Sequence, residues 1–219
     1  MMRRNFDAQL LQLNNSLVEM GKMVEKAIAE ANKALMEQDV ELAQRIIDSD
    51  DEIDHKEKDI EAQCLRLIMQ QQPVAMDLRL VSSIMEISTD LERIGDHAED
   101  ISELTLLIAG KQFIKKLVHI PKMAAETIKM VSESIDAFIN KDIEHANEII
   151  ARDDVIDDLF DTIKAELIEL IKENGENGDQ AIDLVMIAKY FERIGDHATN
   201  IAEWVIFSIT GWHKDIKVM

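Results

Sequence analysis

Apolar residues along this chain recur at alternating spacings of three and four positions. This period is typical of a helix that buries one face against nearly parallel neighbours in a bundle. It predicts helices over about residues 77–109 and 179–209. The apolar positions of the first run are Ile84, Ile87, Leu91, Ile94, Ala98 and Ile101, and those of the second are Leu184, Ile187, Phe191, Ile194, Ala198, Ile201 and Val205.

The same periodicity predicts four further helices. Asp39 and Asp142 each precede one of them, as expected for side chains that accept from the free amides of a helix start. Gly110 and Gly211 suit the helix ends. With only 7 Gly, 2 Pro and 4% aromatic residues, the composition favours helices over strands, so we predict an all-α fold. The four ranges are about 6–37, 39–70, 121–140 and 142–172.

The chain contains an internal duplication. Residues 92–98 read ERIGDHA, and residues 192–198 read ERIGDHA again. Upstream, DVELAQRIIDSDDEID (39–54) matches DIEHANEIIARDDVID (142–157). The first match is offset by 100 residues and the second by 103, so one connecting loop differs in length, as loops tolerate.

Each copy of the repeat holds three of the predicted helices. We therefore predict two tandem antiparallel three-helix bundles, residues 1–112 and residues 113–219. No Gly/Ser/Pro-rich linker separates them, so we expect the two bundles to share some surface.

The charge balance narrows the class of partner. With 44 acids against 24 bases the net charge is -20, which argues against nucleic-acid binding and against membrane insertion. The start of the chain lacks the apolar stretch of a signal peptide, and a cytoplasmic location is expected. The lone Cys64 excludes an intrachain disulfide and a thiolate metal cage.

The candidate chemistry lies in acidic pairs spaced by four residues, which place two carboxylates on one helix face. Oxygen-only ligand sets suit Mg, Ca, Mn or iron. Acids form about a fifth of the chain, however, and a solvated acidic face is the ordinary meaning of such pairs. The pairs are Asp50 with Asp54, Glu92 with Asp96, Asp153 with Asp157, and Glu192 with Asp196.

Two aspartates occupy positions that the pattern assigns to the core. Asp50 follows Ile46 and precedes Ile53 in one apolar run, and Asp153 has the equivalent position in the other copy. A buried carboxylate needs a cation or a donor, so these residues require a metal ion, a cap or an arginine. Arg93 and Arg193 are the candidate arginines, and composition and spacing leave both the metal and the ion pair open.

A catalytic alternative rests on one motif. Residues 52–55 read EIDH, a Glu-x-x-His spacing that di-iron four-helix bundles use. The equivalent stretch in the second copy, 155–158, reads VIDD and lacks both ligands. The motif is therefore interpreted as incidental. The alternative function is a carboxylate-bridged di-iron type of metal-handling helical protein, for which the carboxylate pairs would supply the ligands.

Three segments carry a resemblance to a known family. PVAMDLRLV (73–81), DLERIGDHAEDI (90–101) and FERIGDHATNIAE (191–203), with the two Asp-Asp blocks, resemble the PhoU family of phosphate-specific transport accessory proteins over essentially the whole chain. The family fold is two three-helix bundles, in agreement with the periodicity.

The resemblance implies a role that the residues alone do not show. PhoU proteins are non-enzymatic regulators of inorganic phosphate homeostasis that restrain phosphate uptake and the phosphate-starvation response. They contact a transporter ATPase subunit and a sensor histidine kinase, which would place this chain at the membrane only peripherally. A homodimer is expected for a bundle of this kind.

The resemblance also implies a cofactor. Similar members carry multinuclear iron or zinc clusters on acid-xxx-Asp pairs, which correspond here to the four pairs named above. Asp100 and Asn200 would extend those acidic stripes, and their difference implies unequal sites. Asp77 and Arg79, in a segment without a counterpart in the second copy, are candidates for a partner surface.

Overall fold

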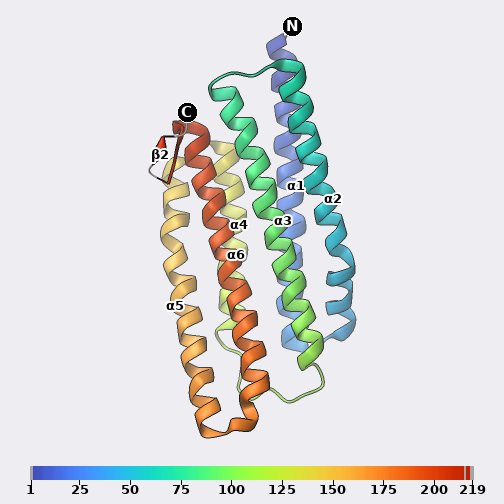
Figure 1. Ribbon diagram of the computed structural model, residues 1–219, viewed down its shortest axis with the longest axis vertical. Coiled ribbons are helices and arrows are strands. Elements are labelled where there is room, and N and C mark those ends of the chain that lie inside the picture. The colour runs from blue at the N-terminus through green and yellow to red at the C-terminus, as the bar shows by residue number, and fades with distance from the viewer. Residues whose placement is uncertain (1, 215, 218–219) are drawn as a thin grey trace.

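The computed structural model describes residues 2–214 and 216–217, and this part of the chain forms six α-helices and one short hairpin (Figure 1). Asp39 and Asp142 cap helix starts as predicted, accepting from the amides of Leu42 (2.9 Å) and His145 (3.0 Å). The elements are α1 (Met2–Glu37), α2 (Val40–Gln71), α3 (Met76–Ile108), α4 (Ile120–Asn140), α5 (Ile143–Glu173), the 3-10 turn η1 (Gly175–Asn177), α6 (Gly178–Thr210), β1 (Trp212–His213) and β2 (Ile216–Lys217).

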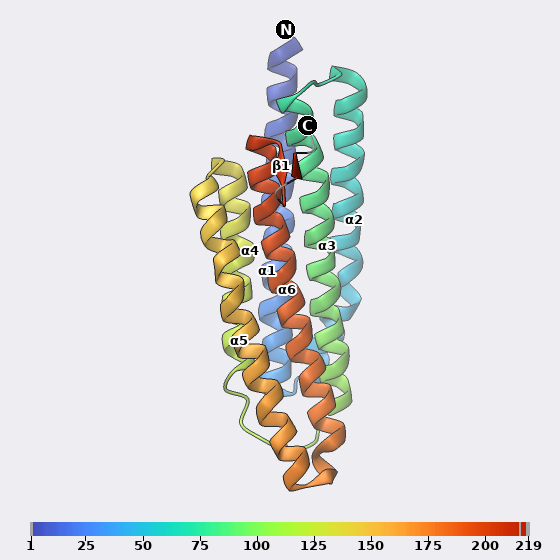
Figure 2. The ribbon, with the colours of Figure 1, turned by 60° about the vertical axis from the view of Figure 1, so that its left-hand side comes forward.

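The two three-helix units pack side by side through α3 and α6. These helices run antiparallel in the middle of the molecule, while α2 and α5 form its opposite edges (Figures 1 and 2). The contacts agree, since Asp90 of α3 meets His197 of α6 and Tyr190 of α6 meets His97 of α3. Helices α1 and α4 also pack across the boundary, so the expected shared surface is confirmed.

The predicted apolar seams form the core. All positions of the seams of α3 and α6 are buried, as are Ile46, Ile53 and Ile60 of α2. Because α3 and α6 each pack against helices on several sides, they carry the motif ERIGDHA into the centre of the molecule. Within this motif Glu92 and Asp96 are half-buried, whereas Asp196 remains exposed.

The end of the chain was not predicted. Gly211 ends α6 with a φ of 80°, as its position suggested, but a two-stranded antiparallel hairpin of β1 and β2 follows it. The His213 ring stacks on Trp204 of α6, with centroids 4.1 Å apart. This tertiary contact holds the hairpin beside α6, and the local sequence pattern gives no sign of it.

None of the helices in residues 2–214 combines the length and apolar character needed to cross a lipid bilayer.

Candidate metal sites between paired helices

The first carboxylate site (Asp50, Asp54, Glu92 and Asp96) lies where α2 packs against α3. One carboxylate oxygen from each of Asp50, Asp54 and Asp96 lies within 4.8 Å of the other two. Within the described residues this is the one group of three acidic, histidine or cysteine ligands that meets so closely. The i, i+4 spacing thus brings acids of two helices together, as a cation site requires.

A glycine in the repeated motif sets the distance between the paired helices. A Cβ on Gly95 would lie 3.1 Å from side-chain atoms of Ile53 and 3.2 Å from Oδ1 of Asp50. A Cβ on Gly195 would lie 3.1 Å from Oδ1 of Asp153. Because no side chain intervenes, the aspartate of the outer helix lies directly against the backbone of the inner helix in both repeats.

Asp50 and Asp153 are half-buried rather than fully buried, and burial and like charge perturb both carboxyl groups. Burial raises the pKa of Asp50 to about 7, with further upward contributions from the charges of Glu99 and Asp96. Burial likewise raises the pKa of Asp153 to about 6, with Asp196 as its strongest acidic neighbour. In the absence of a metal ion, Asp50 and Asp153 are therefore each held among like charges that disfavour their ionised form.

Several carboxylate oxygens lack a donor. Oδ1 of Asp153 and Oε2 of Glu192 are buried and have no hydrogen-bond partner, and Oε2 of Glu92 has only a 3.5 Å contact with Nε of Arg93. Buried oxygens without donors are costly, and a bound cation would satisfy them. The donor set therefore fits a metal that accepts oxygen ligands.

The ion pair that was the alternative to a metal ion at Asp50 forms instead with Asp96. Arg93 donates from Nη1 to Asp96 (3.0 Å), and its Nε lies 3.5 Å from Glu92. For Asp50, the charged neighbours that act on its pKa are all acidic, and no ion pair is present for it among residues 5–214. Arg93 thus neutralises the rim of the first site and leaves its most buried carboxylate without a cationic partner.

The second carboxylate site (Asp153, Asp157, Glu192 and Asp196) lies between α5 and α6 and contains a cation of its own. The Nζ of Lys189 pairs with Oε1 of Glu192 and lies 5.4 Å from the ring centroid of Phe160. Its charge opposes the burial that raises the pKa values of Asp157 and Asp196. A metal entering this site would have to compete with the ammonium group, so the two sites are unequal.

The inequality gives a testable prediction for Lys189→Thr, which installs the residue found at the equivalent Thr89. Removing the competing ammonium should strengthen metal binding at the second site by about tenfold, equivalent to ~1.4 kcal/mol. Calorimetric titration of the metal-free protein measures both sites. Lys164→Thr is the control, since Lys164 lies over the same ring (5.6 Å) but pairs with Asp161. Equal affinities for Lys189→Thr and the wild type would contradict this assignment.

Sequence reasoning missed Glu99. Its charge contributes more to the raised pKa of Asp50 than the charge of Asp96 does. Glu92 and Glu99 are seven residues apart and so share a helix face, a signal that was available but resembled an ordinary solvated stripe. The equivalent residue in the second repeat is Thr199, so the second site also has one acid fewer.

Asp100 and Asn200 lie on a different face from the one predicted. Oδ2 of Asp100 lies 3.2 Å from Nδ1 of His97. Asn200 donates to Asp90 (3.4 Å) and accepts from Lys214 (3.3 Å). Both residues therefore line the boundary between α3 and α6, and the structure does not bring them into the close group of the first site.

The Glu-x-x-His spacing does not reach the first site. Glu52 and His55 are exposed on α2, and Nδ1 of His55 contacts the backbone carbonyl of Asp51. A ligand pair of a di-iron bundle points into the bundle interior. This placement agrees with the interpretation of the motif as incidental.

Asp77 and Arg79 lie in the first turn of α3, after the loop that joins it to α2. Asp77 is the acidic residue of that first turn, and Nε of Arg79 is buried without a hydrogen-bond partner. Beside them Val74 and Met76 are 74% and 62% exposed. The predicted partner surface thus combines charge with exposed apolar side chains.

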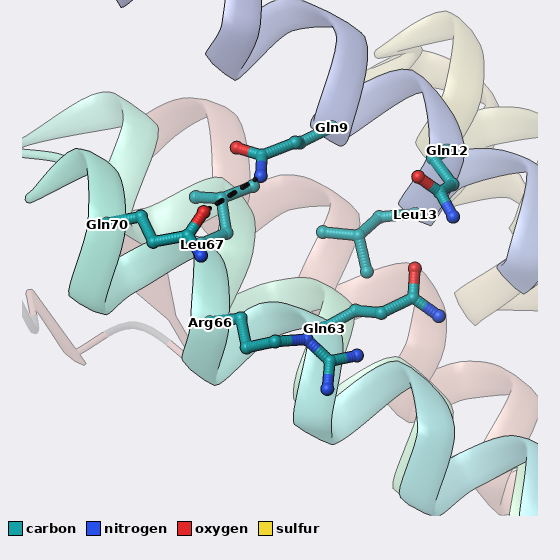
Figure 3. Close-up of a pocket in the computed structure, with 7 residues that line it drawn as sticks. All are labelled: Gln9, Gln12, Leu13, Gln63, Arg66, Leu67 and Gln70. Carbon is teal, nitrogen blue, oxygen red and sulfur yellow. Dashed lines mark hydrogen bonds between the residues drawn. The ribbon is translucent and has the colours of Figure 1, made fainter.

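A separate polar cavity lies near the start of α1 and does not resemble a metal site. It has a volume of about 240 Å³, and Gln9 of α1 donates to Gln70 of α2 across it (3.3 Å; Figure 3). Amide groups and one arginine, Arg66, supply its polar lining, and no carboxylate lines it. Its lining residues are Gln9, Gln12, Leu13, Gln63, Arg66, Leu67 and Gln70.

The chain is similar to known proteins over its full length. The family model described as the PhoU domain matches residues 17–105 and 120–205. A phosphate-specific transport system accessory protein PhoU homolog from Clostridium acetobutylicum is 38% identical over 218 residues, covering 99% of this chain and 100% of that protein. A protein of the same description from Aquifex aeolicus is 39% identical and covers 84% of each chain.

Solved structures agree with the sequence comparisons. The crystal structure of PhoU from Pseudomonas aeruginosa superposes with a TM-score of 0.90 at 34% identity, covering 94% of this chain and all of that one. The phosphate transport system regulatory protein PhoU from Streptococcus pneumoniae gives 0.89 at 30% identity, covering 96% of this chain and all of that one. With its duplicated three-helix units, paired carboxylates and full-length similarity, the chain belongs to the PhoU family.

Proposed function

We propose that this protein is a non-enzymatic accessory protein of phosphate transport that restrains phosphate uptake and the phosphate-starvation response. The observation that carries the proposal is the full-length match to phosphate-specific transport accessory proteins, which leaves no large part of this chain outside the similarity.

The proposal includes metal at both carboxylate sites. A multinuclear cluster, of iron or zinc, with manganese, magnesium or calcium as alternatives, would be held by Asp50, Asp54, Glu92 and Asp96, and by their second-repeat equivalents. The buried oxygens of Asp153 and Glu192 that lack a hydrogen-bond donor support this. Bound metal would supply positive charge and link α2 to α3 and α5 to α6, which would stiffen both units.

The partners in this proposal are a phosphate transporter ATPase subunit and a sensor histidine kinase. The protein would meet them from the cytoplasm and associate with the membrane only through them. The loop before α3 supports a docking role for Asp77 and Arg79, because Val74 and Met76 expose apolar surface beside them. A homodimer is a further part of the proposal.

Deletion of the gene tests the regulatory role. Loss of the protein should leave phosphate uptake and the starvation genes active in phosphate-replete medium, and re-expression should restore their repression. Radiolabelled phosphate uptake and transcript levels are the readouts. Unchanged uptake and unchanged transcripts in the deletion strain would refute the proposal.

Metal affinity should fall as the pH is lowered, because protons compete with the metal for Asp50. Its pKa of about 7 in the metal-free fold exceeds the value of about 3.9 expected in the unfolded chain. The metal-free protein therefore gains stability as pH falls from about 7 towards about 4, whereas protons compete with the metal over the same range. Below about pH 7 the apparent affinity should fall by about tenfold per pH unit.

Titrations at several pH values, with thermal melts with and without chelator, measure both trends. The increase in melting temperature on adding metal should shrink as the pH is lowered. A constant metal affinity between about pH 8 and about pH 5.5 would show that Asp50 is not a ligand.

A further inference from the structure

A groove between α3 and α6 lies between the two carboxylate sites, on the boundary of the repeats. This central groove has a volume of about 650 Å³. It receives residues from both copies of ERIGDHA and from the hairpin after α6. Its lining residues are Arg93, His97, Arg193, Asp196, His197, Thr199, Asn200, Glu203 and Lys214.

The repeated motif has two faces, and only one of them serves the carboxylate sites. In the first ERIGDHA, Glu92 and Asp96 face the outer helix of their own repeat, whereas in the second copy Asp196 also lines the central groove. The arginine and histidine, four residues apart, face the other repeat, where the rings of His97 and His197 lie 5.6 Å apart. The metal sites therefore account for half of the motif and leave its basic half without a role.

The charge of the central groove contrasts with that of the chain. Three basic side chains, Arg93, Arg193 and Lys214, line it beside two acids, Asp196 and Glu203, in a protein whose net charge is -20. Lys214 pairs with Glu203 (3.1 Å), and Arg93 pairs with Asp96. Arg193 is exposed and forms no ion pair with any residue in 5–214. A guanidinium group left free in this way can bind a planar pair of phosphoryl oxygens.

We propose that the central groove binds the phosphoryl group of a small anionic ligand, with Arg193 as its principal contact. Guanidinium groups recognise phosphoryl oxygens by paired hydrogen bonds, and Lys214 adds a point charge. A volume of about 650 Å³ lies in the range of small-molecule sites and exceeds what one orthophosphate ion fills. Both inorganic phosphate and a phosphate monoester such as a nucleotide therefore fit the groove.

The central groove is coupled to the first carboxylate site through Arg93, and this step rests on the proposed metal binding. Arg93 lines the groove while it pairs with Asp96 and Glu92. A metal ion held by those carboxylates would take the oxygens that Arg93 contacts and would leave the guanidinium group for the anion. Metal loading therefore favours anion binding, and by linkage the anion strengthens metal binding by the same factor.

Equilibrium dialysis tests the site with inorganic phosphate and with adenosine monophosphate, each against metal-free and manganese-loaded protein. Arg193→Gln should weaken phosphate binding by about tenfold or more, because it removes a charged hydrogen-bond donor. Arg193→Lys should retain part of the affinity. Arg66→Gln, which removes the same charge from the separate cavity of Figure 3, should leave binding unchanged. Whichever probe binds more tightly identifies the source of the phosphoryl group.

Elemental analysis of the same samples separates this proposal from the metal sites. Weaker phosphate binding by Arg193→Gln at unchanged metal content supports the groove. Unchanged phosphate binding by Arg193→Gln, with loss on metal removal, would assign phosphate to the metal itself and overturn the groove. Phosphate binding by a protein that takes up no metal would refute the metal sites and the coupling but support the groove, provided that Arg193→Gln abolishes it. Metal uptake without binding of either probe would overturn the groove alone.

Discussion

Asp50→Asn is expected to stabilise the metal-free protein and to abolish most of the stabilisation that metal gives. The substitution removes the most perturbed charge of the first carboxylate site and offers an amide donor to the remaining acids, Asp54 and Asp96. The gain should be about 1 kcal/mol near pH 8, or about 2–4 °C in melting temperature for a chain of this size. Metal affinity should fall by at least about 100-fold, because a charged ligand is lost from the cluster.

Thermal melts with chelator and with added manganese or iron measure both effects on one protein. Asp51→Asn is the matched control, since Asp51 is an exposed neighbour on the same helix and carries the same charge. It should change neither the melting temperature of the metal-free protein nor the response to metal by more than about 0.5 kcal/mol. A metal-free Asp50→Asn protein that melts below the wild type, or that keeps the full metal response, would argue that Asp50 serves packing alone.

Asp50→Asn should raise the stability of the metal-free protein and lower its metal affinity, because the carboxylate that binds metal destabilises the fold without it. A half-buried position of α2 that faces α3 is occupied by an acid, which costs stability in the absence of a cation. Two such positions, Asp50 and Asp153, occur at equivalent places in the repeats. A bound metal ion would remove this cost, so the stability of each three-helix unit would depend on metal. The protein could thereby signal that metal is present.

The all-α fold and its duplication could be predicted from the sequence because both depend on local spacing. The three- and four-residue alternation places Ile84, Ile87 and Leu91 on one face, and all three are buried. The caps at Asp39 and Asp142 follow from side-chain chemistry within one helical turn. The hairpin after Gly211 escaped prediction because its stabilising contacts come from elsewhere in the chain.

The candidate sites could be predicted only where the pattern was violated. Asp50 and Asp153 were identifiable because an acid at an apolar position contradicts the period. Lys189 was not, since its effect depends on the distance across to α5 from α6, which no local pattern contains. The two faces of ERIGDHA were also hidden, because the sequence does not tell which repeat a given helix face meets.

Gly95→Val is expected to destabilise the first repeat and to weaken its metal site together. A Cβ alone would already lie 3.1 Å from Ile53 and 3.2 Å from Asp50 Oδ1, and valine adds two methyl groups to this contact. Overpacking of this kind costs about 2 kcal/mol, which exceeds the gain of less than 1 kcal/mol from replacing a helical glycine. The net loss of about 1–2 kcal/mol should lower the melting temperature by about 2–8 °C. Metal affinity should fall as well, because α2 must move away and carry Asp50 with it.

Thermal melts and metal titration are measured on Gly95→Val and on the control Gly178→Val. The comparison separates an effect of the spacing between α2 and α3 from a general effect of placing valine in a helix. Gly178 begins α6 in an ordinary helical conformation, and a Cβ there meets nothing within 4 Å, so its substitution should cost less than about 0.5 kcal/mol. Gly195→Val should reproduce the Gly95→Val result at the second site, since its Cβ would lie 3.1 Å from Asp153 Oδ1. If Gly95→Val retained wild-type stability and metal affinity, the close approach of α2 to α3 could not be what brings the carboxylates together. The expected joint loss would show that the glycine of ERIGDHA acts on the metal site through the helix spacing, without contributing an atom to the ligand set.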